Sequence, residues 1–239
     1  MKKFLAALAV ILVAMVVVSS PVLALSEQIE EIQNFYDAEK AVTKVVNINI
    51  KEEDLEKLKL AGYTLCFAKN VRDQYNVVWS SSTDYLPTNN FTWTPQYEIF
   101  GSNEFIKGVK VKVSTGPKAM ELGQTIQLKA SGVFGTPEKG GESNTLTVIN
   151  DYKDIHIGVM QEYTDINGKL QVEPIYNSLI PEIKGTDTLN PVDKVQIWFE
   201  RDMDTGTMIE NVKSKKIEVD LTKANEATVM YADEEWEKI

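Results

Sequence analysis

The chain has 239 residues, of which 43% are hydrophobic, and 25 Lys+Arg against 35 Asp+Glu give a net charge of −10 at neutral pH. This composition can supply the core of one globular domain or two close ones, and it excludes intrinsic disorder for most of the chain. The acidic balance argues against nucleic acid as a partner, because neutralising phosphates requires a basic surface.

The first 24 residues have the three parts of a secretory signal. Lys2 and Lys3 precede an uncharged run over residues 4–18, and small residues then lead to Ala24. The run is shorter than the roughly 20 apolar residues that a membrane-spanning helix needs. We therefore expect cleavage after Ala24, secretion, and no transmembrane helix in the mature chain. The alternative is an uncleaved signal that anchors the protein in the membrane.

Residues 25–62 are expected to form a helical extension followed by a first strand. Apolar residues at three- and four-residue steps predict an amphipathic helix over residues 26–42. Residues 45–50 alternate between apolar and polar, as a strand does, and residues 53–61 predict a short helix that ends at Gly62.

Residues 63–239 contain about a dozen short aromatic and β-branched segments that are separated by turn residues, which is typical of a sandwich. An Asn-Gly pair at residues 167–168 predicts a hairpin. We expect a mainly β fold, an antiparallel β-sandwich over residues 63–239 with a short N-terminal helical extension. The expected strands are 63–68, 75–79, 91–93, 97–100, 108–113, 123–128, 145–149, 155–159, 170–172, 194–199, 216–221 and 227–231.

Two groups of segments stand out from the rest of the chain. The first is 65–69, 75–79 and 91–97, and the second is 198–200, 205–209, 219–222 and 227–228. Together they resemble a family of small β-rich proteins of fungi and bacteria that has no established activity. The resemblance implies one continuous β domain and points to no particular reaction.

The chain has one histidine and one cysteine, which restricts its catalytic and metal chemistry. A Ser/His/Asp or Cys/His hydrolase would need His156 as its base, but His156 alternates with Ile155 and Ile157, as a surface histidine on the polar face of a strand does. Cys66 is expected to be a buried small residue, and alone it forms no internal disulfide. Zinc is set aside because tetrahedral sites need three or four such ligands, and we expect no cofactor.

A weak calcium candidate lies at Asp202 and Asp204. Acids two residues apart followed by Gly206 resemble the start of a calcium loop. The glycine comes one position early, however, and Lys213 occupies the position of the final glutamate. A tight loop is therefore the favoured interpretation.

Aromatic residues are concentrated between residues 75 and 105. These rings either form the inner faces of adjacent strands or contact a ligand. Tyr85 and Trp93 flank the turn-rich segment 86–90 and are the best candidates for exposed contact residues. Asn90 and Tyr97 complete the predicted ligand-binding set.

We expect a secreted, acidic binding module rather than an enzyme, since no catalytic constellation is recognisable. Its loops and exposed aromatic rings would bind a glycan, a lipid or a cell-surface ligand. One alternative is a membrane-active, pore-forming type of protein whose segment 26–42 enters the bilayer, although its acidic face argues against this. Another is a hydrolase with two carboxylates, which abundant Asp and Glu neither support nor forbid.

Overall fold

A computed structural model of the chain describes residues 43–209, 212 and 214–239. The expected signal over residues 1–24 and the expected helix over residues 26–42 lie outside the described residues. The elements are β1 (Lys44–Ile50), α3 (Glu52–Leu60), β2 (Tyr63–Val71), β3 (Ser80–Ser82), β4 (Thr88–Ser102), β5 (Lys118–Met120), β6 (Gln124–Leu128), β7 (Glu138–Lys139), β8 (Leu146–Asn150), β9 (His156–Thr164), β10 (Leu170–Asn177), β11 (Gly185–Leu189), β12 (Pro191–Arg201), β13 (Lys216–Asp220), β14 (Glu226–Ala232) and β15 (Glu235–Lys238).

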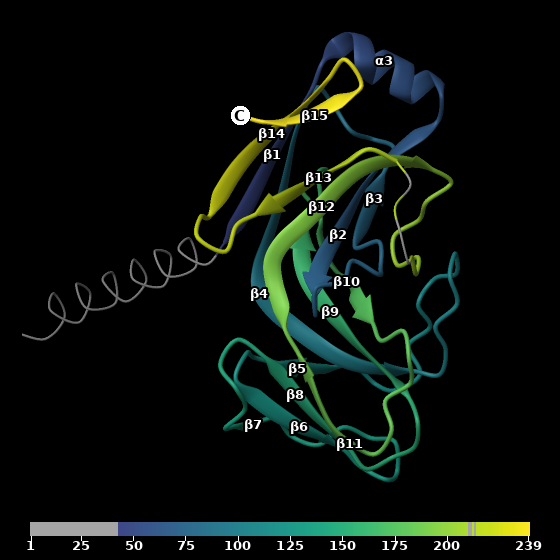
Figure 1. Cartoon of the computed structure of the whole chain (residues 1–239), viewed down its shortest axis with the longest axis vertical. Coiled ribbons are helices and arrows are strands. Elements are labelled where there is room, and N and C mark those ends of the chain that lie inside the picture. The colour runs from purple at the N-terminus through teal and green to yellow at the C-terminus, as the bar shows by residue number, and fades with distance from the viewer. Residues whose placement is uncertain (1–42, 210–211, 213) are drawn as a thin grey trace, which may run out of the picture. The chain divides into compact units, whose positions relative to one another are not determined.

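The strands form three sheets in the described part of the chain, as Figure 1 shows. The large sheet has the order β10-β9-β4-β1-β14-β15, and β5 pairs with β4. The facing sheet has the order β13-β12-β2-β3, and the small sheet has the order β11-β8-β6-β7. Most pairs are antiparallel, and the β1–β14 and β6–β8 pairs are parallel. The predicted mainly β, sandwich architecture is confirmed.

An aromatic core joins the large sheet to the facing sheet. Phe67 of β2 stacks on Phe91 of β4, with ring centroids 4.1 Å apart and ring planes 9° apart. Trp79 packs edge-on against Phe91 and Tyr163 at 5.1 Å, and against Trp93 at 5.7 Å. Offset and edge-to-face ring pairs are the favoured aromatic geometries. Most of the aromatic concentration seen in the sequence is therefore packing between the two sheets.

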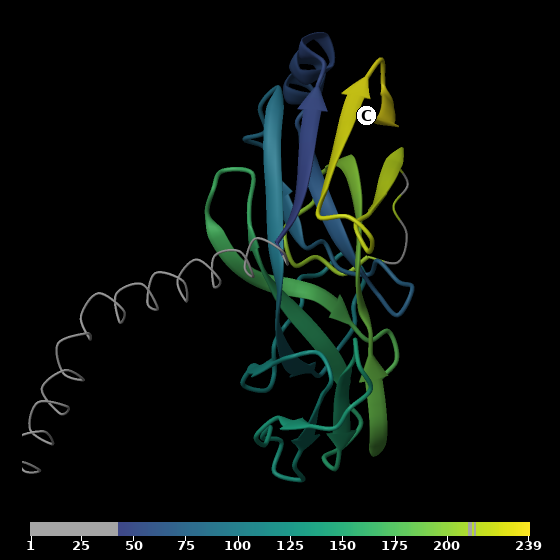
Figure 2. The same cartoon turned by 90° about the vertical axis from the view of Figure 1, so that its left-hand side faces the viewer.

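β1 lies inside the large sheet, between β4 and β14. Val46 and Ile48 are buried because they lie on the face of β1 that packs into the main hydrophobic core. The first strand, which the sequence groups with the helical extension, thus contributes directly to the core. Figure 2 shows β1 and β14 running side by side toward the end of the sandwich that carries α3.

Local sequence signals account for the helix and for one hairpin. Acidic residues occupy the first turn of α3 and lysines the last, and Gly62 follows it with a φ of 70°. The predicted hairpin joins β9 to β10, where Gly168 has a φ of 76° and Asp165 Oδ1 accepts the backbone N–H groups of Asn167 and Lys169. Both predictions are confirmed.

Two of the expected strands do not form. Residues 75–79 and 108–113 make only isolated bridges, including Val77 with Met208 and Lys110 with Thr207. Alternation alone does not produce a strand, because a ladder also needs a neighbour along its length. In the segment 108–113 the apolar side chain of Val109 is exposed instead of covered.

The position of β1 in the core predicts different effects for two isoleucine substitutions. Ile48→Ala should lower the free energy of unfolding by roughly 2–5 kcal/mol, because it leaves a cavity between packed sheets. Ile180→Ala is the matched control, since Ile48 is 0% exposed and Ile180 is 76% exposed. The control should change stability by less than about 0.5 kcal/mol in urea unfolding. Equal effects in the two variants would contradict a core role for β1.

Candidate functional site

The four side chains predicted to contact a ligand do not share one surface. Tyr85, Trp93 and Tyr97 have exposed fractions of 0%, 2% and 4%, whereas Asn90 is exposed. The expected exposure of Tyr85 and Trp93 is therefore wrong, and Tyr97 is buried as well. Trp93 is buried because alternate residues of β4 point between the two sheets, and Tyr85 packs edge-on against Phe199 at 5.3 Å.

The calcium candidate lies in a loop that is held by other contacts. The Asp204 carboxylate is 3.1 Å from the ammonium group of Lys110, and Asp202 has a φ of 52°. Within residues 43–209, 212 and 214–239, no three His, Cys, Asp or Glu side chains come together as metal ligands. Asp202 and Asp204 therefore gain no third carboxylate from the described residues.

His156 and Cys66 are both buried. Nδ1 of His156 lies 2.6 Å from the carbonyl oxygen of Ser178, to which it donates a hydrogen bond, so the expected surface histidine is wrong. Cys66 has no exposed surface, and burial raises the pKa of its thiol, which confirms the expected buried small residue. A buried thiol with a raised pKa is a poor nucleophile because little thiolate forms.

The most unusual residue of the core is a buried lysine. Lys69 of β2 has no exposed surface, and its Nζ lies 2.7 Å from Oδ1 of Asp193. The ammonium group also lies 4.5 Å from the ring centroid of Trp93 and 5.6 Å from that of Trp79. Desolvation lowers the pKa of Lys69 to about 8, although Asp193 favours its charged form.

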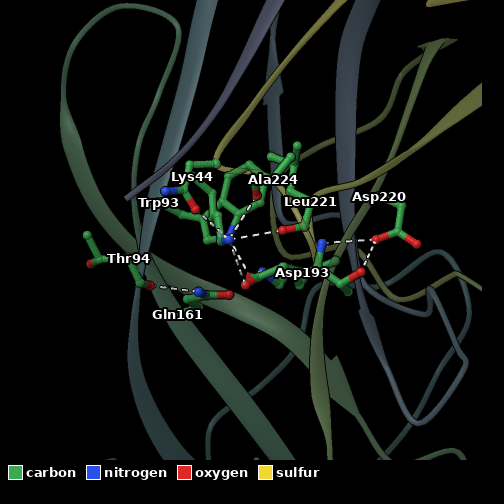
Figure 3. A network of polar contacts seen from close by, with 11 residues as sticks. Lys44, Trp93, Thr94, Gln161, Asp193, Asp220, Leu221 and Ala224 are labelled. Carbon is green, nitrogen blue, oxygen red and sulfur yellow. Dashed lines mark hydrogen bonds and ion pairs between the residues drawn. The ribbon is translucent and has the colours of Figure 1, made fainter. Parts of the chain in front are cut away.

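Asp193 links Lys69 to a wider polar network, part of which Figure 3 shows. Burial alone would raise the pKa of Asp193, but Lys69, Trp93 and Lys44 together lower it. Nε1 of Trp93 donates to Oδ1 of Asp193 at 3.0 Å, and Lys44 Nζ lies 3.8 Å from Oδ2. Lys44 also donates to the carbonyl oxygens of Leu221 and Ala224 at 2.9 Å each. The network therefore ties both sheets and the loop after β13 together.

A pocket of about 370 Å³ lies where α3 approaches the ends of β2, β12 and β14, and we call it the α3 pocket. Figure 1 shows α3 and the β14–β15 hairpin at this same end of the sandwich. Tyr63, Phe199 and Tyr231 supply its aromatic lining, one from each of the three strands. The pocket thus combines side chains that are far apart in the sequence.

The aromatic lining of the α3 pocket is held in place by ring contacts. Phe199 is stacked with Trp236 at 5.4 Å and packs edge-on against Tyr231 at 4.9 Å. The guanidinium group of Arg201 lies 4.9 Å from the ring centroid of Tyr63. Tyr63 and Tyr231 are half-buried, so part of each ring remains accessible. A ligand would therefore meet aromatic surfaces that need little reorganisation.

Charged side chains of both signs surround these rings. Asp54 and Glu234 line the α3 pocket together with Lys57 and Lys215, so these four formal charges cancel. Burial raises the pKa of Tyr231, and the carboxylates of Asp54 and Glu234 raise it further. The Tyr231 hydroxyl group is therefore protonated at neutral pH and can donate a hydrogen bond.

Glu234 reaches the rim through a strained turn. Asp233 and Glu234 join β14 to β15 with φ angles of 52° and 63°, a region that residues with a Cβ disfavour. The turn is held by Asp54, whose Oδ2 accepts the backbone N–H of Asp233 at 2.6 Å, and by Lys51, whose Nζ lies 2.8 Å from Oδ1 of Asp233. The buried carboxylate of α3 thus positions one wall of the pocket.

A larger pocket of about 580 Å³ lies beside β4 and β5. Among the described residues that line it, Tyr97 is the single aromatic residue and is nearly fully buried. Its charged lining residues, Glu98, Glu121 and Glu162, are all acidic. The larger pocket therefore lacks both the aromatic walls and the balanced charge of the α3 pocket.

Comparison with protein families, curated proteins and solved structures finds no match for this chain. The family resemblance seen in the sequence therefore stays a prediction. No helix in the described part of the chain is long and apolar enough to span a bilayer.

The aromatic residues of the α3 pocket were not predicted from the sequence. Tyr63, Phe199 and Tyr231 each occupy an ordinary strand pattern, and only the fold brings them together. One local signal was available, because Tyr231 and Trp236 are aromatic residues on either side of a short acidic turn. Paired aromatics across a hairpin end are a recognisable surface feature.

The strained turn predicts that Glu234→Gly raises the stability of the protein. Glycine adopts a positive φ without the steric penalty of a Cβ, so the free energy of unfolding should rise by about 1 kcal/mol. Urea unfolding monitored by tryptophan fluorescence measures the change. Glu237→Gly in β15 is the control and should lower stability by roughly 0.5–1 kcal/mol, because it loosens an extended strand. A loss of stability in Glu234→Gly would contradict the assignment of strain.

Proposed function

We propose that this protein is a secreted, non-catalytic binding module that takes a neutral glycan in the α3 pocket. The observation that carries the proposal is an open pocket with aromatic walls from three strands and balanced charges at its rim. The pattern of a secretory signal at the N-terminus supports an extracellular ligand.

A sugar matches both kinds of surface in the pocket. The C–H face of a sugar ring packs on an aromatic ring, and its hydroxyl groups exchange hydrogen bonds with polar side chains. Tyr63 and Tyr231 offer half-buried rings, while Lys57, Lys215 and Glu234 offer donors and acceptors. The cancelling charges favour a neutral polar ligand over an anion or a cation.

The position of Glu234 also supports a binding role. The turn between β14 and β15, in which Glu234 has a φ of 63°, places its side chain at the lining of the α3 pocket. Its carboxylate at the pocket rim can accept hydrogen bonds from two neighbouring hydroxyl groups of a sugar.

The contacts of Asp54 favour binding over hydrolysis. A hydrolase with two carboxylates needs one as an acid and the other as a base or nucleophile. Asp54 is buried, accepts the backbone N–H of Asp233, and lies 3.4 Å from Lys57. Its carboxylate is therefore engaged in holding the turn.

The proposal predicts that Tyr231→Ala weakens glycan binding. A screen of neutral oligosaccharides identifies the tightest ligand, and isothermal titration calorimetry then gives its dissociation constant. Loss of the stacking ring should raise that constant at least tenfold, which corresponds to about 1.4 kcal/mol. Tyr152→Ala is the matched control, since Tyr152 is half-buried like Tyr231 but lies outside the pocket, where its ring is beside Lys153.

Two results would overturn the proposal. One is the absence of binding to any neutral oligosaccharide in the screen. The other is equal weakening by Tyr231→Ala and Tyr152→Ala, which would place the ligand elsewhere. Thermal unfolding of each variant separates lost contacts from lost folding.

A further inference from the structure

The irregularity of β12 directs one carboxylate into the core. Along the β2–β12 ladder, Val192 lies opposite Asn70 and Val195 lies opposite Lys69, so residues 193–194 have no partner on β2. Lys194 pairs with Asp220 on the other edge, at the protein surface. The side chain of Asp193 instead contacts Lys69 and, through Nε1 of Trp93, the large sheet. The bulge thus places an acid beside a buried amine.

The surroundings of this pair exclude competing partners from the amine. Lys69 has no exposed surface, and its Nζ is 2.7 Å from Oδ1 of Asp193, with the rings of Trp79 and Trp93 on its other sides. The Asp193 side chain is 28% exposed, so one side of the carboxyl group reaches solvent. An amine and a carboxyl group in fixed contact react with a high effective concentration.

We propose that Lys69 and Asp193 condense to an intramolecular isopeptide bond that links Nζ of Lys69 to Cγ of Asp193 and cross-links β2 to β12. This inference is independent of glycan binding in the α3 pocket.

The condensation balances without an oxidant, a metal or a co-reactant. A proton passes from the Lys69 ammonium group to the Asp193 carboxylate and comes to lie on Oδ2, which gives a neutral amine and a carboxylic acid whose carbonyl oxygen is Oδ1. The Nζ lone pair attacks Cγ, a C–N bond forms, and the carbonyl electron pair moves to Oδ1. As the C=O bond re-forms, the C–Oδ2 bond breaks. Oδ2 leaves as water with the acid proton and one proton from nitrogen.

Groups already in contact with Asp193 assist each step. Nε1–H of Trp93, 3.0 Å from Oδ1, stabilises the negative charge that develops on that oxygen. The ammonium group of Lys44, 3.8 Å from Oδ2, favours departure of that oxygen. Burial lowers the pKa of Lys69 to about 8, which increases the fraction of neutral amine. The exposed side of Asp193 gives the released water a path to solvent.

The amide product costs less free energy to bury at this site than the ion pair does. A buried ion pair carries a desolvation penalty, whereas an amide is neutral and its oxygen still accepts the N–H group of Trp93. The bond would join residues that are 124 positions apart. A cross-link over so long a segment restricts the unfolded chain strongly. A secreted protein with one cysteine has no internal disulfide to serve this purpose.

Mass spectrometry of the purified, denatured protein tests the proposal directly. The wild-type protein should be lighter by one water molecule than its sequence requires, and a protease digest should contain a branched peptide that joins the Lys69 and Asp193 segments. Lys69→Arg and Asp193→Ala should each show the full mass of their sequence. Because the wild-type mass is measured after denaturation, the result does not depend on whether these variants fold.

A second ion pair on β12 supplies the control. Lys194 and Asp220 lie 3.2 Å apart on the surface, and their side chains are 35% and 41% exposed, so water reaches both groups. Lys194→Arg should keep the loss of one water molecule and the branched peptide. The proposal is overturned if the wild-type protein has the full mass and Lys69 is recovered in a linear peptide. A mass lower by one water molecule without the branched peptide would also overturn it. That result indicates that an aspartate side chain has lost water by closing on its own backbone, which leaves the peptide linear.

Discussion

A buried lysine side chain in the middle of an aromatic core, paired with one aspartate, is the constraint on which the structure depends. An isolated ammonium group could not be buried between two sheets, so Lys69 requires Asp193 within hydrogen-bond distance. Asp193 reaches that position only because β12 departs from its regular register. It then accepts Nε1–H of Trp93 from the opposite sheet and lies beside Lys44 of β1. The Lys69–Asp193 pair of the facing sheet is thereby joined to β4 and β1 of the large sheet.

The α3 pocket depends on the same two strands. β2 begins at Tyr63 and carries Lys69 further along, while β12 carries Asp193 near its start and Phe199 near its end. Since the strands are antiparallel, the contact between Lys69 and Asp193 fixes the register that brings Tyr63 and Phe199 to one end of the sandwich. α3 and the β14–β15 turn complete the pocket there. The pairing of β2 with β12 therefore positions both the buried Lys69–Asp193 pair and two aromatic residues of the α3 pocket.

Local signals in the sequence predicted the local structure well. Period-two alternation identified most strands, and Gly62 and Gly168 marked a helix end and a hairpin. The sequence could not show that Trp93 faces inward, because a turn nearby does not decide which strand face is covered. Nor could it show the burial of Lys69, whose partner is 124 residues away. The α3 pocket could not be predicted for the same reason, since its lining residues come from well-separated segments of the sequence.

We propose that a β-sandwich, cross-linked between Lys69 and Asp193, presents the aromatic α3 pocket to a sugar. Chemical-shift mapping by NMR tests this most directly, with the tightest neutral oligosaccharide titrated into the isotope-labelled protein. If the sugar binds in the α3 pocket, perturbed amide and tyrosine ring signals are confined to α3, the start of β2 and the turn between β14 and β15. Perturbations centred on the larger pocket beside β4 and β5, or no perturbation at all, would contradict it.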